Sequence, residues 1–518
     1  MIFSPLDRTA AERLTRLAYT NPFLPERVNL ERQILGRDFE SAPPVLHREA
    51  GFRFDVLHPN IAKLNAVTRR VVERARERLL ATPSPEAAEL QLYGDVCLFS
   101  LYLLIETDLD VRVGSTAAIA RSSDWSDCWR RFSPEFDRLL KISGRSSIVP
   151  HTPEHAFAVF FQIARAFLHI YEHILGSSKA ATQLRASVWE SIFSHDLRRY
   201  SHWLYRHMDQ IATLVTGPSG SGKELVAKAI GVSQYIPFDA RRAVFICDHG
   251  AAFQAVNLSA LPLTLIESEL FGHHKGAFTG ATAARIGWLE QCPQEGAVFL
   301  DEIGELDVTL QVKLLRVLQT RAFSRVGETT ERKFRGKLIA ATNRNLTDEM
   351  HAGRFRPDLF YRLCADQIVT PSLHEQLQEV PDDLHHYVSH VARRIFGEDS
   401  NDMDDFVAET EQWIEQNLSP HYAWPGNIRE LEQCVRNLLI HRNYQPAQFH
   451  QKSQTATSLD RFLSDIKATS LSRDQLDGRY FALVLSRSAN LEEAASRLGV
   501  DRRTLKRLLD QEFYDALC

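Results

Sequence analysis

The feature that most constrains the fold of this chain is a glycine-rich loop followed at once by a lysine. Its residues are Gly217, Pro218, Ser219, Gly220, Ser221, Gly222, Lys223 and Glu224. The apolar run IATLVT (211–216) precedes the loop, and the helical pattern ELVAKAI follows its lysine. In such a strand–loop–helix unit the backbone N–H groups bind phosphate and the lysine reaches the terminal phosphates. The loop therefore predicts a nucleotide-binding α/β domain; a structural glycine turn is the alternative.

Short apolar runs alternate with helical patterns from about residue 184 onward. Besides the run before the loop, they are AVFI (243–246), FQAVN (253–257), AVFLD (297–301) and KLIAATN (337–343). Such alternation predicts a parallel sheet covered by helices.

Two carboxylates, Asp301 and Glu302, stand where the run AVFLD ends. We expect them at the sheet edge where the phosphates bind, with Asp301 holding Mg²⁺ and Glu302 polarising the attacking water. Glu224 occupies the position where this kind of loop usually has Ser or Thr for the metal, so other groups must hold it. Asn343, after the run KLIAAT, can position the water or sense the γ-phosphate. The alternatives are an acidic helix cap for the pair and a polar turn residue for Asn343.

Helical patterns fill the chain on both sides of this region. Residues 1–183 are predicted to be an all-α regulatory bundle, which ends in a polar stretch of linker type (176–183). Three of its helices are expected to begin at Ser84-Pro-Glu, Ser133-Pro-Glu and Thr152-Pro-Glu, each with an N-cap hydroxyl and a proline at the first helical position. The other expected boundaries are an α/β subdomain at 184–375, a helical lid at 376–445, a polar linker at 446–475 and a C-terminal helical domain at 476–518.

Composition narrows the partners and the compartment. A chain of 518 residues suggests three or four domains, and a net charge of −5 excludes nucleic-acid binding through global charge. The longest apolar stretch, Val96–Ile105, is about half the length of a membrane helix, and the N-terminus has no apolar signal segment. The seven cysteines are scattered without CxxC spacing. We therefore expect a cytoplasmic protein with no membrane partner.

The last helical segment has the pattern of a helix–turn–helix. Asn490 is expected to cap a first helix, Gly499 to make the turn and Asp501 to cap a second helix. The second helix carries the candidate DNA contacts Arg502, Arg503, Thr504, Lys506 and Arg507. A local basic surface on an acidic chain indicates DNA binding; a solvated charged helix is the alternative.

The stretch ESELFGHHKGAFTGA (267–281) places a phenylalanine between flexible glycines. Its last six residues are Gly276, Ala277, Phe278, Thr279, Gly280 and Ala281. No periodic pattern would bury Phe278 in such a loop, although a buried loop anchor is the alternative. With these residues the chain, from about 205 to 442, resembles the bacterial enhancer-binding proteins. These are AAA+ activators of RNA polymerase carrying sigma-54, and in them a GAFTGA loop contacts sigma-54.

The resemblance assigns roles to four more residues. Asn257 matches the asparagine that restrains the catalytic glutamate. Arg356 and Arg362, in GRFRPDLFYRL, match the arginine fingers, and a guanidinium suits this role because it is always charged. Arg429, in WPGNIREL, matches a second sensor that closes from the lid onto bound nucleotide.

The sequence also departs from the family in three places. TPSLHE (370–375) stands where an arginine-bearing segment is usual, and Lys337 replaces an arginine. The stretch between Lys223 and Asn257 is about a dozen residues longer than expected and looks like an inserted or extended hairpin around VFICDHGAAFQAV. The sequence indicates no function for this insertion.

The resemblance implies a multidomain fold with an all-α N-terminal bundle, an α/β AAA+ P-loop ATPase core with a helical lid, and an all-α helix–turn–helix domain. It implies a hexamer, dimeric when inactive, that uses ATP and Mg²⁺ to remodel sigma-54 RNA polymerase holoenzyme while bound to upstream enhancer DNA. Residues 1–183 would fold independently, receive an unidentified signal and gate ring assembly. Two alternatives are a DNA-bound regulator whose AAA+ core is an oligomerisation scaffold without hydrolysis, and an AAA+ protein remodeller unrelated to transcription.

Overall fold

The computed structural model divides into two compact units, Met1–Arg442 and Asn443–Cys518. It describes residues 1–41, 59–114, 125–142, 147–247, 250, 252–279, 281–397, 401–419, 422–446, 462, 465–466, 471–488, 490–510 and 513–514.

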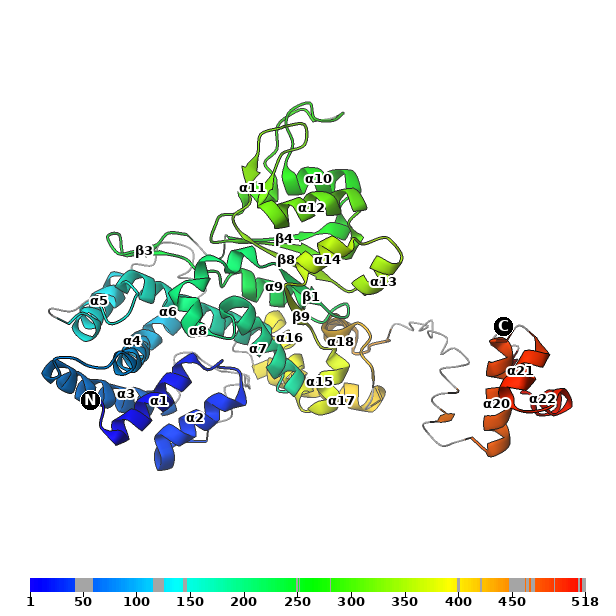
Figure 1. The fold of residues 1–518 in the computed structure, drawn as a ribbon, viewed down its shortest axis with the longest axis horizontal. Helices are drawn as coiled ribbons and strands as arrows, with labels where there is room; N and C mark the ends of the chain where they lie inside the picture. Colours follow the sequence, from blue (N-terminus) through cyan, green and yellow to red (C-terminus); the bar gives the residue numbers. More distant parts are fainter. Residues whose placement is uncertain are drawn as a thin grey trace. The chain divides into compact units, whose positions relative to one another are not determined.

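The N-terminal region is helical, as the sequence predicts (Figure 1). Its α-helices are α1 (Pro5–Tyr19), α2 (Pro25–Leu35), α3 (Pro59–Ala81), α4 (Ala87–Gly114), α5 (Ser126–Leu140), α6 (Pro153–His173), α7 (Lys179–Phe193) and α8 (Leu197–His202). A 24-residue stretch of α4, Ala87–Asp110, is long and apolar enough to cross a membrane, and 61% of its apolar window is buried. The core helix of a folded protein has the same pattern, so this helix is weak evidence for a membrane span.

The three expected helix starts have different outcomes. Thr152 caps α6 by accepting a hydrogen bond from the His155 N–H, and Pro153 is the first helical residue, as expected. The helix after Ser84 begins at Ala87, two residues later than expected. The third start is wrong, because Pro134 lies inside α5.

A five-stranded parallel sheet forms the centre of the α/β region and confirms the predicted fold class. Its strand order is β4 (Phe253–Asn257), β5 (Ala297–Asp301), β8 (Lys337–Thr342), β1 (Thr213–Thr216) and β9 (Asp366–Val369). All four strand pairs are parallel. The edge strand β9 was not predicted. The run AVFI does not join this sheet, because β3 (Val244–Phe245) pairs with β2 (Phe238–Asp239) in a separate antiparallel hairpin.

Alternate residues of the central strands are buried on opposite faces of the sheet, as a period of two requires. Leu214 and Leu338 belong to a core shared with α10 (Leu263–Phe271), α12 (Val308–Thr320) and α14 (Pro357–Leu363). Val215 and Ile339 belong to a core on the other face. Figure 1 shows α10, α12 and α14 on one side of the sheet. The remaining short elements are α11 (Trp288–Gln291), α13 (Leu346–His351) and the hairpin strands β6 (Ala322–Phe323) and β7 (Arg332–Lys333).

The second face of the sheet is covered by α9 (Lys223–Gly231) together with two helices of the N-terminal region. Ala166 and Ile170 of α6 and Trp189 of α7 share one hydrophobic core with α9 and the strands. The boundary expected between 183 and 184 falls inside α7, and Ser178 caps that helix within the expected linker. The N-terminal region and the α/β region therefore form one compact unit instead of two independent ones.

Four helices follow the sheet where the lid was expected: α15 (Leu373–Glu379), α16 (Asp383–Phe396), α17 (Asn401–Asn417) and α18 (Asn427–His441). In the second unit, α20 (Arg473–Ser486), α21 (Leu491–Leu498) and α22 (Arg502–Leu508) surround a small core of Ala494, Ala495 and Leu505. The boundary expected at 475/476 falls inside α20, which begins three residues earlier.

Candidate nucleotide site and contact loops

The glycine-rich loop lies between β1 and α9, as the sequence predicts. Gly217, Gly220 and Gly222 all have positive φ, at 148°, 75° and 88°, in the region that favours glycine. The ammonium group of Lys223 donates to the carbonyl oxygens of Gly217 and Pro218 at 3.0 Å each. Burial lowers the Lys223 pKa, while the nearby Glu302 and Asp301 oppose this shift. The loop lysine and both carboxylates therefore share one electrostatic environment.

The lid lies directly on this loop. A Cβ atom on Gly220 would come within 2.2 Å of the Gly426 carbonyl oxygen, so only glycine allows this approach. The Ile428 N–H donates to the Gly220 carbonyl at 3.1 Å. The ideal Cβ position on Gly220 is also 3.3 Å from the Cβ of Arg429, which places the predicted sensor arginine beside the loop.

Asn427, which the sequence analysis did not single out, joins three parts of the site. Its side-chain amide donates to the Ser219 carbonyl at 2.9 Å and accepts from the Leu373 N–H at 2.8 Å. The residue is 2% exposed and has a left-handed φ of 53°. Asparagine tolerates this backbone region, so the turn WPGN is the signal that could have identified it.

The atypical segment TPSLHE also contributes to the site. The Thr370 hydroxyl lies 2.6 Å from the Ser221 hydroxyl, and the Thr370 N–H donates to the Thr216 carbonyl at 2.8 Å. Ser372 and Glu375 form a reciprocal capping box at the start of α15. The segment thus replaces the family's arginine-bearing sequence with contacts to the loop and a helix cap.

The acid pair lies at the carboxyl end of β5, next to the loop of β1. The Glu302 N–H donates to an Asp301 carboxylate oxygen at 3.1 Å, and the Asn343 N–H donates to a Glu302 carboxylate oxygen at 3.4 Å. Glu302 has a left-handed φ of 58°, which is uncommon for a residue with a side chain. Strained backbone of this kind concentrates at functional sites.

Asn257 lies opposite Asp301 in the register of β4 and β5. Its side-chain oxygen accepts hydrogen bonds from the Ser259 N–H at 2.9 Å and the Ser259 hydroxyl at 2.7 Å. Within the described part of the chain, no hydrogen bond joins Asn257 to Glu302. The structure therefore brings Asn257 to the correct sheet edge, with its side chain engaged in a local turn.

Arg356 and Arg362 lie at the two ends of α14. Arg356 forms a two-pronged ion pair with Asp358, at 3.0 and 2.7 Å, and its backbone N–H donates to Gln311 at 2.8 Å. Arg362 is exposed. No contact with the phosphate loop of the same chain is present for either arginine among the described residues.

Lys337 is completely buried, and its ammonium group donates to the carbonyls of Ile211 at 2.9 Å and Met208 at 3.4 Å. Burial lowers its pKa to about 8. The lysine thus fastens β8 to the connection that leads from α8 into β1. This contact is a structural role for the second departure from the family.

The GAFTGA loop lies between α10 and α11, and Phe278 is 42% exposed. Its ring makes an edge-to-face contact with His273, with centroids 5.0 Å apart. The Gly276 N–H donates to the Ala281 carbonyl at 2.8 Å, and the Ala281 N–H donates to the Phe278 carbonyl at 3.0 Å. Ala277 and Thr279 complete the described part, and Gly280 lies outside the described residues. The loop is therefore a closed turn that presents its phenylalanine to solvent.

In the second unit, Asn490 and Asp501 cap the two helices as predicted, and Gly499 makes the turn with a φ of 68°. Of the candidate DNA contacts, Arg502, Arg503, Lys506 and Arg507 are exposed. Arg502 pairs with Glu492, and the Thr504 hydroxyl donates to Asp501 at 2.8 Å.

Comparison with known proteins identifies the α/β region. A family model described as the sigma-54 interaction domain matches residues 195–369. The chain is 40% identical over 310 residues to the Nif-specific regulatory protein of Enterobacter agglomerans, covering 60% of this chain and 52% of that protein. It is 35% identical over 328 residues to the DNA-binding transcriptional regulator NtrC of Azospirillum brasilense, covering 57% of this chain and 63% of that protein.

The crystal structure of NtrX from Brucella abortus in complex with ATP aligns with a TM-score of 0.38 and 23% identity, covering 70% of this chain and 76% of that chain. The chain spans about half to two thirds of the length of the two curated relatives.

Proposed function

Because this chain belongs, through its sigma-54 interaction domain, to the sigma-54-dependent enhancer-binding activators, we propose that it hydrolyses ATP to remodel the closed complex of sigma-54 RNA polymerase. The observation that carries the proposal is the combination, in one α/β domain, of a phosphate loop, an acid pair on a nearby strand and an exposed Phe278. In this proposal the chain works in the cytoplasm, with 376–445 as lid and 446–475 as linker to the DNA-binding domain.

The residues present fit ATP and Mg²⁺. The loop glycines have the backbone conformation that an anion-binding turn needs, and the Lys223 ammonium points back into that turn. Magnesium is usually held by one or two carboxylates together with substrate phosphates, which matches the lone acid pair. No cluster of three or more metal-binding side chains occurs in the described ranges. Asp301 would hold the metal ion, which supplies charge neutralisation on the phosphates.

Glu302 orients the attacking water and accepts its proton in this proposal. Its backbone conformation and the Asn343 N–H fix the direction of the carboxylate. Arg429 closes from the lid onto the nucleotide, since it already lies beside Gly220. Asn257 reaches Glu302 once its side chain leaves Ser259.

Arg356 and Arg362 act on the nucleotide of a neighbouring subunit. The absence of a described contact with their own phosphate loop and the exposure of Arg362 support this assignment. A charge supplied in trans implies a ring, which we take to be a hexamer that is dimeric when inactive. Removing such a finger lowers turnover by about 10³- to 10⁵-fold.

The C-terminal unit holds the ring on upstream enhancer DNA. Arg503, Lys506 and Arg507 support this role because they are exposed on α22, while Arg502 contributes less because it pairs with Glu492. Phosphate contacts from such side chains give affinity, and base contacts give specificity.

The test measures ATP binding, ATP turnover and open-complex formation with sigma-54 polymerase for four variants. Lys223→Ala abolishes ATP binding, and Glu302→Gln binds ATP without turnover. Phe278→Ala keeps turnover and loses open complexes, whereas the exposed control Leu6→Ala on α1 keeps all three. ATP binding without turnover in the unchanged protein would favour the scaffold alternative. Turnover without any effect on sigma-54 polymerase would favour a protein remodeller.

A further inference from the structure

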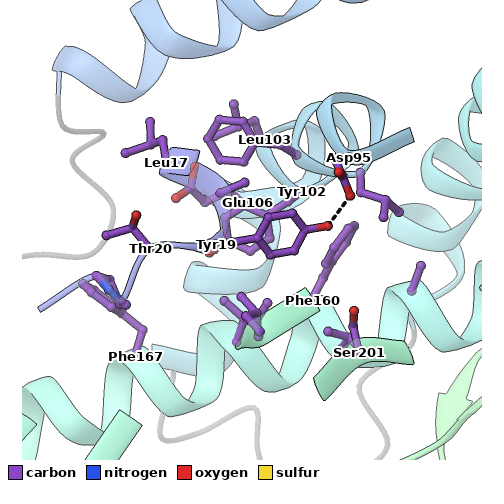
Figure 2. Close-up of a pocket in the computed structure, with 18 of the residues that line it drawn as sticks. Leu17, Tyr19, Thr20, Asp95, Tyr102, Leu103, Glu106, Phe160, Phe167 and Ser201 are labelled. Carbon is purple, nitrogen blue, oxygen red and sulfur yellow. Dashed lines mark hydrogen bonds between the residues drawn. The ribbon is translucent and has the colours of Figure 1, made fainter. Parts of the chain in front are cut away.

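The N-terminal region contains a cavity of about 190 Å³, and none of the proposed nucleotide-site residues lines it. Its walls come from α1, α2, α3, α4, α6, α7 and α8, and they are mostly apolar, with Tyr102, Phe160 and Phe167 among the aromatic side chains (Figure 2). A dry protein cavity of about 150 Å³ holds one benzene molecule. The cavity thus has room for one aromatic ring with a short substituent.

One carboxylate of the cavity wall is already satisfied by the protein. The Tyr19 hydroxyl donates to Asp95 at 2.8 Å, as Figure 2 shows, and Arg198 donates to the other oxygen of Asp95 at 2.5 Å. The positive charge of Arg27 is also matched, because Arg27 pairs with Glu31 at 3.0 Å.

Two other acids on the wall have no such partner. Glu106 and Asp110 lie one turn apart on α4, and both line the cavity. No described residue donates a hydrogen bond to either carboxyl group. Burial raises the Glu106 pKa to about 8, with a further contribution from Asp110, and raises the Asp110 pKa to about 7. Both side chains are half-buried at the cavity wall, so an occupant that supplies a donor or a positive charge would satisfy two carboxyl groups to which no described residue donates.

We propose that the cavity binds a small apolar amine, with the ring against the aromatic walls and the protonated nitrogen between Glu106 and Asp110. Above pH 8, where both carboxyl groups are mostly ionised, an anionic ligand would place a third negative charge beside two carboxylates. A neutral hydrocarbon would fill the cavity and leave both carboxyl groups without donors. A cation satisfies both groups, and Tyr102, one turn before Glu106 on α4, provides an aromatic ring on the same wall.

The proposal predicts a specific pH dependence, since a proton competes with the cation for Glu106. The charged and titratable groups that face Glu106 are Asp110 and Tyr102 on its own helix and Arg27 and Glu31 on α2. Amine affinity rises from pH 6 to pH 8, by up to about 100-fold, and levels off above the Glu106 pKa.

The two histidines on the cavity wall, His151 and His155, do not account for this trend. Burial lowers the His151 pKa to about 3 and also lowers the His155 pKa. The two rings therefore gain no charge that would repel the amine between pH 6.5 and pH 8.

The experiment is calorimetric titration of the full-length chain with three probes of similar shape: 2-phenylethylamine, propylbenzene and phenylacetate. We expect 2-phenylethylamine to bind at least tenfold more tightly than propylbenzene, and phenylacetate not to bind. Glu106→Gln lowers the affinity for the amine at pH 8 by at least tenfold and leaves that for propylbenzene unchanged. The exposed Glu12→Gln on α1 is the matched control and changes neither value.

Equal amine affinity in Glu106→Gln and the unchanged chain, or tighter binding of propylbenzene than of the amine, would overturn the proposal. Benzylamine and cyclohexylmethylamine are two further small apolar amines. Binding of 2-phenylethylamine without binding of these two would also overturn the proposal. Propylbenzene binding and the thermal midpoint show whether Glu106→Gln is folded. None of these measurements depends on ATP hydrolysis, so the outcome is independent of the proposed function.

Discussion

The N-terminal region and the C-terminal unit, both predicted to be separate modules, are joined to the rest of the chain in different ways. The C-terminal unit is a separate compact body with its own core around Ala494 and Leu505. The N-terminal region shares a hydrophobic core with the five-stranded sheet through α6 and α7. A change at the N-terminal region can therefore reach the sheet through direct packing.

Polar contacts strengthen the N-terminal junction, by which we mean the contacts of α6 with residues 232–234. The Arg165 guanidinium is completely buried and donates to the carbonyls of Val232 at 3.0 Å and Gln234 at 2.6 Å. Gln162 donates to the Ser233 carbonyl at 2.8 Å. These carbonyls follow directly after α9, the helix that begins at Lys223. The junction thus connects a wall of the cavity to the helix of the phosphate loop.

The insertion before Asn257, to which the sequence assigns no function, also packs against α6. Phe245 of its hairpin stacks on Phe161 of α6, with ring centroids 3.9 Å apart, and contacts Trp125 at 5.3 Å. The insertion therefore extends the α/β region into the aromatic core of the N-terminal helices.

The largest expected effect comes from removing the N-terminal region, in comparison with removing the C-terminal unit. A chain that begins at 184 lacks the first five residues of α7 and exposes the apolar face of α9, so we expect it to lose cooperative unfolding and ATP binding. A chain that ends at Arg442 keeps both. Thermal unfolding of the two truncated chains measures cooperativity, and nucleotide titration measures ATP binding. A folded, ATP-binding 184–518 fragment would restore the independent N-terminal domain that the sequence predicts.

Arg165→Met tests the N-terminal junction without removing it. The substitution leaves two buried carbonyls without donors, and we expect it to lower the free energy of unfolding by about 3 kcal/mol. Arg199→Met, which removes an exposed ion pair with Asp196, is the control and should cost less than about 1 kcal/mol. Equal effects in urea unfolding would show that the Arg165 hydrogen bonds do not stabilise the junction.

Lys337, which fastens β8 to the connection from α8 to β1, makes the free energy of unfolding depend on pH. Its pKa of about 8 in the folded chain is below the usual value of 10.5, so the unfolded chain binds more protons between these values. Stability therefore rises with pH across this window, by about 2 kcal/mol from pH 8 to pH 10. Unfolding midpoints of the unchanged chain and Lys337→Met over this range measure the difference, and parallel curves would exclude the contribution of Lys337.

Substitutions in the C-terminal unit are expected to have the smallest effect on ATP turnover. Arg503→Ala should weaken DNA binding and reduce the slope of log affinity against log salt by about one. ATP turnover without DNA should not change. Arg497→Ala on α21 is a control outside the proposed DNA surface. A change in ATP turnover with Arg503→Ala would show that the C-terminal unit affects ATP hydrolysis even without DNA.

The local parts of the site could be predicted from the order of the amino acids alone. The phosphate loop, the acid pair, the GAFTGA turn and the two C-terminal caps all form where the residues predict, because each depends on neighbours a few positions away. The alternation of apolar runs with helical patterns predicted the other four strands of the parallel sheet but not β9. Its four residues Asp366–Val369 alternate little and are short enough to resemble a loop.

The attachment of the helical region to the sheet, and the cavity that this region encloses, could not be predicted in this way because they depend on long-range packing. Ser133-Pro-Glu has the same cap pattern as Thr152-Pro-Glu, yet Pro134 lies within α5, since burying Phe132 and Phe136 on one face outweighs the lost backbone hydrogen bond. The cavity, the Arg165 contacts and the role of the inserted hairpin likewise arise from residues distant in the chain. Local patterns fix caps and turns, but long-range burial selects which helix faces meet, and no short stretch of sequence contains that information.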